Sequence, residues 1–204
     1  MAYKKNFEKS ALLEALQLLS DRLSLNKSSS YSILVCGGSA LIAMNYKQRV
    51  TKDVDILALI DDEKYLSDPD PLPEELLKAA RDVSLDLDLP ADWLNNGPSQ
   101  GDGGLFRMGL PEGIIKRAVK QTFGKYLTVF WIDRFDQIHL KLYASIDRGG
   151  YHIEDLLELN PTEEEIFAAS AWCMTHDVSE GFKRLLLSFL GKFGYDTVVS
   201  KLQK

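Results

Sequence analysis

The chain has 204 residues, of which 45% are hydrophobic and 26% are charged, and its formal net charge is -6. This composition is typical of a globular protein with a buried core, as one domain or as two small lobes. The net negative charge excludes a surface that is basic throughout for coating nucleic acid, although it allows a local basic groove. No stretch approaches the roughly 18 apolar residues of a membrane span, and the first residues do not resemble a secretory signal, so we expect a cytoplasmic protein with no membrane partner.

The N-terminal part of the chain predicts a helix followed by a buried strand. Leucines recur at helical spacing between residues 12 and 23, which indicates an amphipathic helix whose leucines face the core. Residues 32–36 are apolar and partly β-branched, as in a buried strand. Cys36 and Cys173 are the only cysteines, and they predict neither a disulfide framework nor a zinc site.

Two glycines and a serine follow this strand. Gly37 and Gly38 allow a tight turn and a close approach of a ligand to the backbone. Residues 40–44 are good helix formers, so Ser39 is predicted near a helix N-terminus, where N–H groups and the helix dipole favour an anion such as phosphate. By itself, a Gly-Gly pair after a strand is more often only a turn.

An acidic pair, Asp53 and Asp55, opens the next apolar run, which ends at Ile60. Alternation along a strand places both carboxylates on one face and Val54 on the other. Neighbouring carboxylates repel each other unless a cation lies between them or one is protonated. Mg²⁺ suits them because it commonly joins one or two carboxylates to substrate phosphates, and two such ions can support an in-line phosphoryl displacement. An isolated Asp-x-Asp is often only solvated or a helix cap, but the order of strand, glycines, helix and acidic strand favours a functional site.

This order resembles the nucleotidyltransferase superfamily that includes DNA polymerase beta, whose signature is Gly-Gly or Gly-Ser, a helix, and Asp-x-Asp or Asp-x-Glu. The AbiEii-type toxin nucleotidyltransferases and their bacterial relatives carry an Arg-x-Ser/Thr-x-Asp-x-Asp form, which this chain matches at Arg49, Thr51, Asp53 and Asp55. The resemblance spans roughly residues 30–175. It implies an α/β (α+β) fold, in which a small mixed sheet is flanked by helices and followed by a helical C-terminal region.

The resemblance also implies a metal ion and a nucleotide as ligands. The metal is Mg²⁺, bound by Asp53 and Asp55, which are then also catalytic residues. The nucleotide is a nucleoside triphosphate, and its expected binding residues in these first motifs are Gly37, Gly38, Ser39, Arg49 and Thr51.

A later segment of the family pattern is a helical Lys followed by Arg and by an acidic segment, which correspond to Lys141, Arg148 and Asp155. Without the resemblance, Lys141 is better interpreted as a lysine whose stem covers an apolar edge, and Asp155 as a surface acid or helix cap. With it, Lys141 is expected to bind the triphosphate and stabilise charge on the phosphoryl oxygens. Asp155 is expected to orient or deprotonate the acceptor.

The middle of the chain carries three further expectations. Residues 95–104 are rich in Gly, Asn and Ser and predict an exposed loop, with a substrate lid as the less favoured alternative. A basic cluster is interpreted as a solvated helix face in preference to an RNA-binding patch, and consists of Lys116, Arg117, Lys120 and Lys125. Residues 126–132 are β-branched and aromatic and predict another central strand.

That strand lacks the third carboxylate that many polymerase-beta-like enzymes supply from a later strand. Asp133 lies at its end, and either Asp133 or Asp155 would have to complete the site. A long helix is then expected over residues 136–148, and Thr162 with Glu165 has the spacing of a capping box that starts another helix. We therefore expect a sheet lobe over residues 1–135 and a helical region over residues 136–204, which together form two domains or one.

The expected reaction is Mg²⁺-dependent transfer of a nucleoside monophosphate from a triphosphate to a hydroxyl of RNA, such as tRNA, or of a protein. The main alternative is a catalytically silent nucleotidyltransferase-like module that binds a partner, for example the antitoxin protein of a toxin–antitoxin pair. A third interpretation is a phosphate-ester hydrolase that uses the same two acids.

Overall fold

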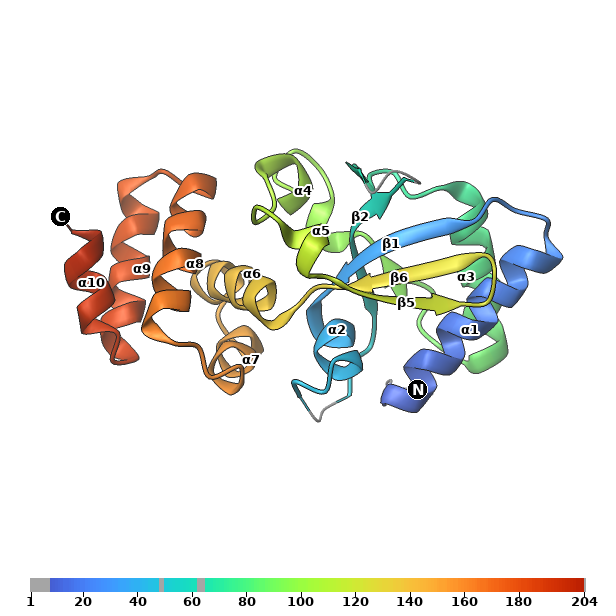
Figure 1. Ribbon diagram of the computed structural model, residues 1–204, viewed down its shortest axis with the longest axis horizontal. Helices are drawn as coiled ribbons and strands as arrows, with labels where there is room; N and C mark the ends of the chain where they lie inside the picture. The colour runs from blue at the N-terminus through green and yellow to red at the C-terminus, as the bar shows by residue number, and fades with distance from the viewer. Residues whose placement is uncertain (1–7, 48–49, 62–64, 204) are drawn as a thin grey trace. The chain divides into compact units, whose positions relative to one another are not determined.

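The computed structural model describes residues 8–47, 50–61 and 65–203 of the chain (Figure 1). The chain divides into two compact units, Met1–Asp133 and Arg134–Lys204. The first unit carries a mixed sheet with helices around it, and the described residues of the second form helices and their connections. The predicted fold class is thereby confirmed.

Among the residues that the structure describes, six strands form the sheet of the first unit. They are β1 (Tyr31–Cys36), β2 (Val54–Ile60), β3 (Leu66–Ser67), β4 (Leu94–Asn95), β5 (Val119–Phe123) and β6 (Leu127–Trp131). The order is β3-β2-β1-β6-β5, and β4 pairs with β2 on the same edge as β3. β1 runs parallel to β6 and antiparallel to β2, and β5 runs antiparallel to β6. β1 is a central strand, which explains its continuous apolar sequence, since Ile33, Leu34 and Val35 are all fully buried.

The helices of the first unit are α1 (Lys9–Leu25), α2 (Gly37–Ala43), α3 (Glu74–Leu87), the 3-10 helix η1 (Gly97–Ser99), α4 (Leu105–Met108) and α5 (Ile114–Arg117). The predicted leucine face of α1 is confirmed, because its spaced leucines Leu12, Leu16, Leu19 and Leu23 are fully buried. α1 packs against α3, and α2 packs against β1 and β2. α2 begins directly at Gly37, three residues earlier than its helix-forming run predicts.

One sequence interpretation in this unit is wrong, and another is right only in part. The basic cluster is not one helix face, because Lys120 lies in β5 and Lys125 lies in the turn between β5 and β6. The β-branched Val119 and Thr122 favour this strand, and pairing with β6 fixes it. The exposed loop predicted over residues 95–104 is confirmed for Gly97 and residues 100–103, but Ser99 is fully buried and its hydroxyl donates to Leu57 O at 2.7 Å.

The second unit contains α6 (Arg134–Asp147), α7 (Tyr151–Glu158), α8 (Glu163–His176), α9 (Glu180–Lys192) and α10 (Asp196–Leu202). α6 packs against both α7 and α8, and its buried face includes Ile138 and Leu142. The predicted capping box at the start of α8 is confirmed, since Thr162 Oγ1 accepts from Glu165 N–H and the Glu165 carboxylate accepts from Thr162 N–H. None of the described helices is long and apolar enough to cross a membrane.

Candidate functional site

Strand ends from three positions of the sheet meet at one edge of the first unit. β1 ends at Cys36, whose register partner on antiparallel β2 is Asp55. β6 runs parallel to β1 and ends at the same level, since Val35 pairs with Trp131 and Ile132 N–H donates to Val35 O at 3.1 Å. The start of β2, Gly37 after β1 and Asp133 after β6 therefore lie at the same end of three neighbouring strands.

Gly37 lies directly against the Asp55 carboxylate. Its backbone φ is +71°, a left-handed conformation that side-chain-bearing residues rarely adopt. A Cβ at this position would lie 2.2 Å from Asp55 Oδ2, much closer than any real contact. Only glycine therefore permits the carboxylate to occupy this position beside the end of β1.

Gly38 and Ser39 are both buried in the first turn of α2. The Ser39 hydroxyl donates to Cys36 O at 3.3 Å, which ties the start of the helix to the end of the strand. The predicted position of Ser39 near a helix N-terminus is confirmed. Phosphate binding by these residues stays a prediction.

Asp53 precedes β2 and is oriented by a neighbouring threonine. Thr51 Oγ1 lies 3.2 Å from Asp53 Oδ1 and donates to it, and it also lies 3.4 Å from Asp53 O. Thr51 is only 6% exposed, so its hydroxyl is held in place beneath the carboxylate. The structure thus gives Thr51 a positioning contact with Asp53, and its predicted contact with a nucleotide stays a prediction.

The predicted alternation along this segment is confirmed. Asp53 and Asp55 are both half-buried, whereas Val54 between them is fully buried. Two half-buried carboxylates at a strand end form a donor set that fits Mg²⁺, which needs only one or two protein carboxylates beside substrate phosphates and water. Arg49, the remaining residue predicted in this motif, lies outside the described residues.

Asp133 lies close to Arg117, a member of the predicted basic cluster. Arg117 Nε lies 3.9 Å from Asp133 Oδ1, and the two side chains are 30% and 26% exposed. Within residues 8–47, 50–61 and 65–203, no three His, Cys, Asp or Glu side chains form a group able to hold a metal ion. Asp133 therefore does not join Asp53 and Asp55 as a third member of such a group in this structure.

Lys141 and Asp155 lie in the second unit, on α6 and α7. Lys141 Nζ donates to Asp155 Oδ2 at 2.7 Å, and the two side chains are 6% and 0% exposed. Nζ also lies 5.7 Å from the centre of the Tyr151 ring, within the range of a cation–π contact. The structure thus brings these two predicted residues together as a buried ion pair, while their roles toward a triphosphate and an acceptor stay predictions. Arg148 is exposed and pairs with its neighbour Asp147 at 3.2 Å.

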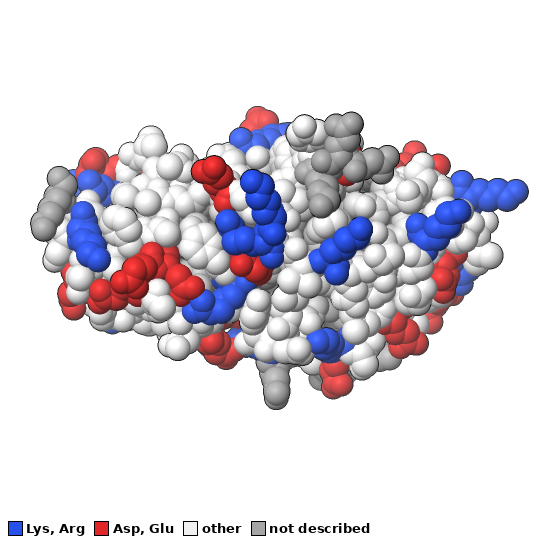
Figure 2. All heavy atoms as spheres, viewed as in Figure 1, with Lys and Arg blue, Asp and Glu red and all other residues white. Residues whose placement is uncertain are grey.

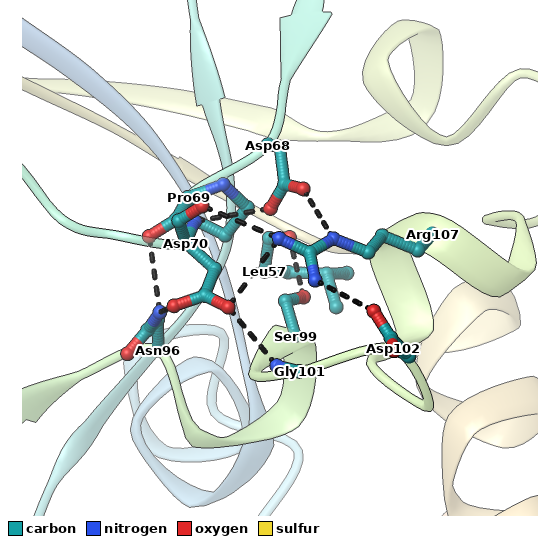
Figure 3. A network of polar contacts seen from close by, with 9 residues as sticks. All are labelled: Leu57, Asp68, Pro69, Asp70, Asn96, Ser99, Gly101, Asp102 and Arg107. Carbon is teal, nitrogen blue, oxygen red and sulfur yellow. Dashed lines mark hydrogen bonds and ion pairs between the residues drawn. The ribbon is translucent and has the colours of Figure 1, made fainter.

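A polar network fixes the segment that follows β4 (Figure 3). Arg107 points its guanidinium toward the carboxylates of Asp68, Asp70 and Asp102, with N–O distances of 2.7, 3.4 and 3.4 Å. The hydrogen bond from Arg107 lowers the pKa of Asp68. On the other side of the segment, Gly101 N–H donates to Asp70 Oδ2 at 3.0 Å. The network joins residues 68–70 to residues 96–107, and β4 within this region pairs Asn95 with Asp55.

The face of the molecule drawn in Figure 2 carries charges of both signs. Acidic and basic side chains are interspersed on this face, and the basic ones do not form a continuous surface. Comparison of the chain with protein-family models, curated proteins and solved structures gave no significant match. A functional conclusion therefore depends on the residues themselves and on their resemblance in sequence order to the nucleotidyltransferases.

Proposed function

We propose that the chain is an Mg²⁺-dependent nucleotidyltransferase that transfers a nucleoside monophosphate from a nucleoside triphosphate to a hydroxyl acceptor on RNA or protein. The observation that carries the proposal is the contact of Gly37 with Asp55, which a Cβ would obstruct at 2.2 Å. It joins the two sequence motifs, the glycine turn and the acidic strand, at one point of the fold.

The proposed residue roles follow from this arrangement. Asp53 and Asp55 would hold Mg²⁺, which when bound neutralises phosphate charge and orients the triphosphate. Thr51 would keep Asp53 oriented through its hydrogen bond of 3.2 Å. The phosphates would lie close to the backbone of Gly37, Gly38 and Ser39.

In the proposed reaction, the acceptor hydroxyl oxygen bonds to the α-phosphorus while the bond from that phosphorus to the bridging β-phosphate oxygen breaks, and pyrophosphate leaves. The hydroxyl proton passes to a carboxylate, for which the resemblance suggests Asp155. Lys141 would stabilise phosphoryl charge. An ammonium has three N–H donors, so Lys141 can contact a phosphate without losing its bond of 2.7 Å to Asp155.

The test is transfer from α-labelled nucleoside triphosphates with Mg²⁺, with and without total tRNA, by wild-type protein and two variants. Asp53→Asn keeps the size of the side chain and an oxygen that can accept from Thr51, but it removes charge needed for Mg²⁺. We expect transfer to fall at least about 100-fold with an unchanged circular dichroism spectrum, as for the loss of a transition-state electrostatic contact. The control is Asp61→Asn, at the exposed opposite end of β2, where the side chain accepts from Tyr65 N–H and an asparagine can do the same.

Full activity in Asp53→Asn would contradict the proposed mechanism. Nucleotide or partner binding by wild type without any labelled product or pyrophosphate would favour the catalytically silent module. Release of inorganic phosphate without a labelled acceptor would favour a phosphate-ester hydrolase. An antitoxin protein that copurifies with the chain and stops transfer would support a toxin–antitoxin pair.

A further inference from the structure

Arg117 lies at the same edge of the sheet as the candidate metal ligands. One row of register partners crosses three strands, since Val119 on β5 pairs with Trp131 on β6, which pairs with Val35 on β1. Arg117 comes two residues before this row, and Asp133 and Gly37 each come two residues after it. Because β5 is antiparallel to β6, and β6 is parallel to β1, all three residues lie beyond the same end of the row.

The position of the Arg117 guanidinium is defined by contacts within its own segment. Nη2 donates to Glu112 O at 2.8 Å, and Nε faces Asp133 Oδ1 at 3.9 Å. A Cβ on Gly113 would lie 2.9 Å from Nη1, so the glycine leaves room for the guanidinium to fold back against the chain. With 30% of its side chain exposed, Arg117 is both held in place and open to solvent.

The charges at this end of the strands favour pairing of Asp133 with Arg117. Asp53 and Asp55 already place two negative charges there, and a third unpaired carboxylate would add repulsion. Asp133 instead faces a cation, and it does not join the other two acids in a group able to hold a metal. The strand end that could have supplied a third metal ligand thus presents a guanidinium.

We propose that Arg117 binds the β- and γ-phosphates of the triphosphate, and that Asp133 positions Arg117 and is not a metal ligand. This inference rests on the proposed function and extends it by naming the phosphate-tail contact of the first unit. Neighbouring strands are about 4.8 Å apart, so β5 lies about 10 Å from β1. In this proposal, the triphosphate extends from Gly37 toward Arg117. A guanidinium suits this place because its planar N–H donors bind phosphate oxygens in pairs and stabilise the pyrophosphate as it leaves.

The test compares binding of a triphosphate and a monophosphate of the same nucleoside, each with Mg²⁺, by isothermal titration calorimetry. Arg117→Gln should weaken triphosphate binding by about 10- to 100-fold, as for the loss of a charged hydrogen-bonded contact, and change monophosphate binding less than about 2-fold. Arg117→Lys should recover part of the loss. Lys125→Gln is the matched control, because it removes one positive charge at the exposed turn that joins the opposite ends of β5 and β6, and it should bind both ligands like wild type.

A second measurement tests whether Asp133 positions Arg117 or binds the metal ion. Mn²⁺ affinity without nucleotide, followed by electron paramagnetic resonance, should be unchanged in Asp133→Asn and strongly reduced in Asp53→Asn. Equal losses in the two variants would show that Asp133 is a metal ligand and would overturn the assignment. Wild type that binds no triphosphate would refute the proposed function itself, whereas normal triphosphate binding by Arg117→Gln in an active protein would refute this inference alone. Thermal unfolding of each variant shows whether a loss of binding reflects a loss of fold.

Discussion

The two groups of candidate residues have their carboxylates in opposite environments. In the first unit, Asp53 and Asp55 are half-buried, and Asp53 accepts its bond from the neutral Thr51 hydroxyl. In the second unit, Asp155 is fully buried and accepts from the Lys141 ammonium. A half-buried carboxylate keeps its affinity for an added cation, whereas a buried, charge-paired carboxylate already has one. The comparison separates half-buried carboxylates, which the proposed function assigns to a metal, from a buried carboxylate whose charge is already paired with an ammonium.

The largest expected effect is on stability in the second unit. Lys141→Met leaves Asp155 buried without its cation, so the free energy of unfolding should fall by about 3–5 kcal/mol, measured by chemical denaturation. Replacing both partners, in Lys141→Met with Asp155→Leu, should recover most of that loss because apolar residues of similar volume fill the same space. A single Lys141→Met variant as stable as wild type would show that the charge of Asp155 does not depend on Lys141.

The activity of the double variant tests whether the pair has a role beyond stability. If the pair is structural only, the double variant is stable and retains transfer. If Lys141 also binds the triphosphate, as the resemblance implies, the double variant is stable but inactive. The two readings of the pair therefore give opposite activities in a protein of nearly normal stability.

An intermediate effect is expected at the glycine of the first unit. Gly37→Ala introduces a Cβ 2.2 Å from Asp55 Oδ2 at a φ of +71°. The φ alone costs roughly 1–2 kcal/mol. The proposed function predicts that Mn²⁺ raises the melting temperature of wild type, and the displaced carboxylate in Gly37→Ala should abolish that rise. Gly101→Ala is the matched control, because Gly101 has the same φ of +71° but nothing within 4 Å of the added Cβ.

Both alanine variants should be destabilised, but only Gly37→Ala should lose the response to Mn²⁺. An identical Mn²⁺ response in the two variants would show that Asp55 tolerates the added methyl group. It would also remove the observation on which the proposed function depends.

The smallest expected effect is the pH dependence of another ion pair in the second unit. Burial opposes ionisation of Glu165, but its bonds from Arg134 and from Thr162 N–H outweigh burial and hold the pKa of Glu165 below its ordinary value of 4.5. A lowered pKa stabilises the folded state above the unfolded pKa, and this contribution is lost as the pH falls through the folded pKa.

Glu165→Gln should therefore lower the free energy of unfolding by about 1 kcal/mol at neutral pH, and this difference from wild type should shrink as the pH falls below about 4.5. Glu164→Gln, on the exposed side of the same helical turn, is the control and should show little difference at any pH. A difference for Glu165→Gln that does not change with pH would show that the contact acts through packing and not through charge.

The strand, glycine turn, helix and acidic strand of the first unit could be predicted because each depends on neighbouring residues. An apolar run, a Gly-Gly pair and an alternating Asp-x-Asp each depend on a few neighbouring residues. They indicate the local backbone conformation and the face of the strand on which a side chain lies. The contact of Gly37 with Asp55 could not be predicted in detail, because it depends on the register of two strands, which pairs Cys36 with Asp55. Sequence order predicts that the motifs are close but not which atoms meet.

The charge partners of the site were less predictable, because they depend on tertiary packing. The resemblance implies separate roles for Lys141 and Asp155. Their spacing in the sequence does not show that α6 and α7 pair them with each other. A signal was present at Gly149 and Gly150, which break the helix and allow α7 to fold back along α6. The sequence predicts a solvated helix face at Arg117 because the local pattern does not show the hairpin of β5 and β6, which brings Arg117 to Asp133.

The arrangement on the outer side of β2 limits how this sheet can associate with other chains. β3 pairs with the end of β2 at Leu59 and Ile60, β4 pairs with its start at Val54 and Asp55, and the Ser99 hydroxyl occupies Leu57 O between them. The acidic strand therefore offers no continuous free edge to which a foreign strand can add. Strand addition, whether by an inhibitory partner or in aggregation, is directed to β5 at the other end of the sheet order, where the exposed Lys120 opposes close packing of a second, like-charged edge.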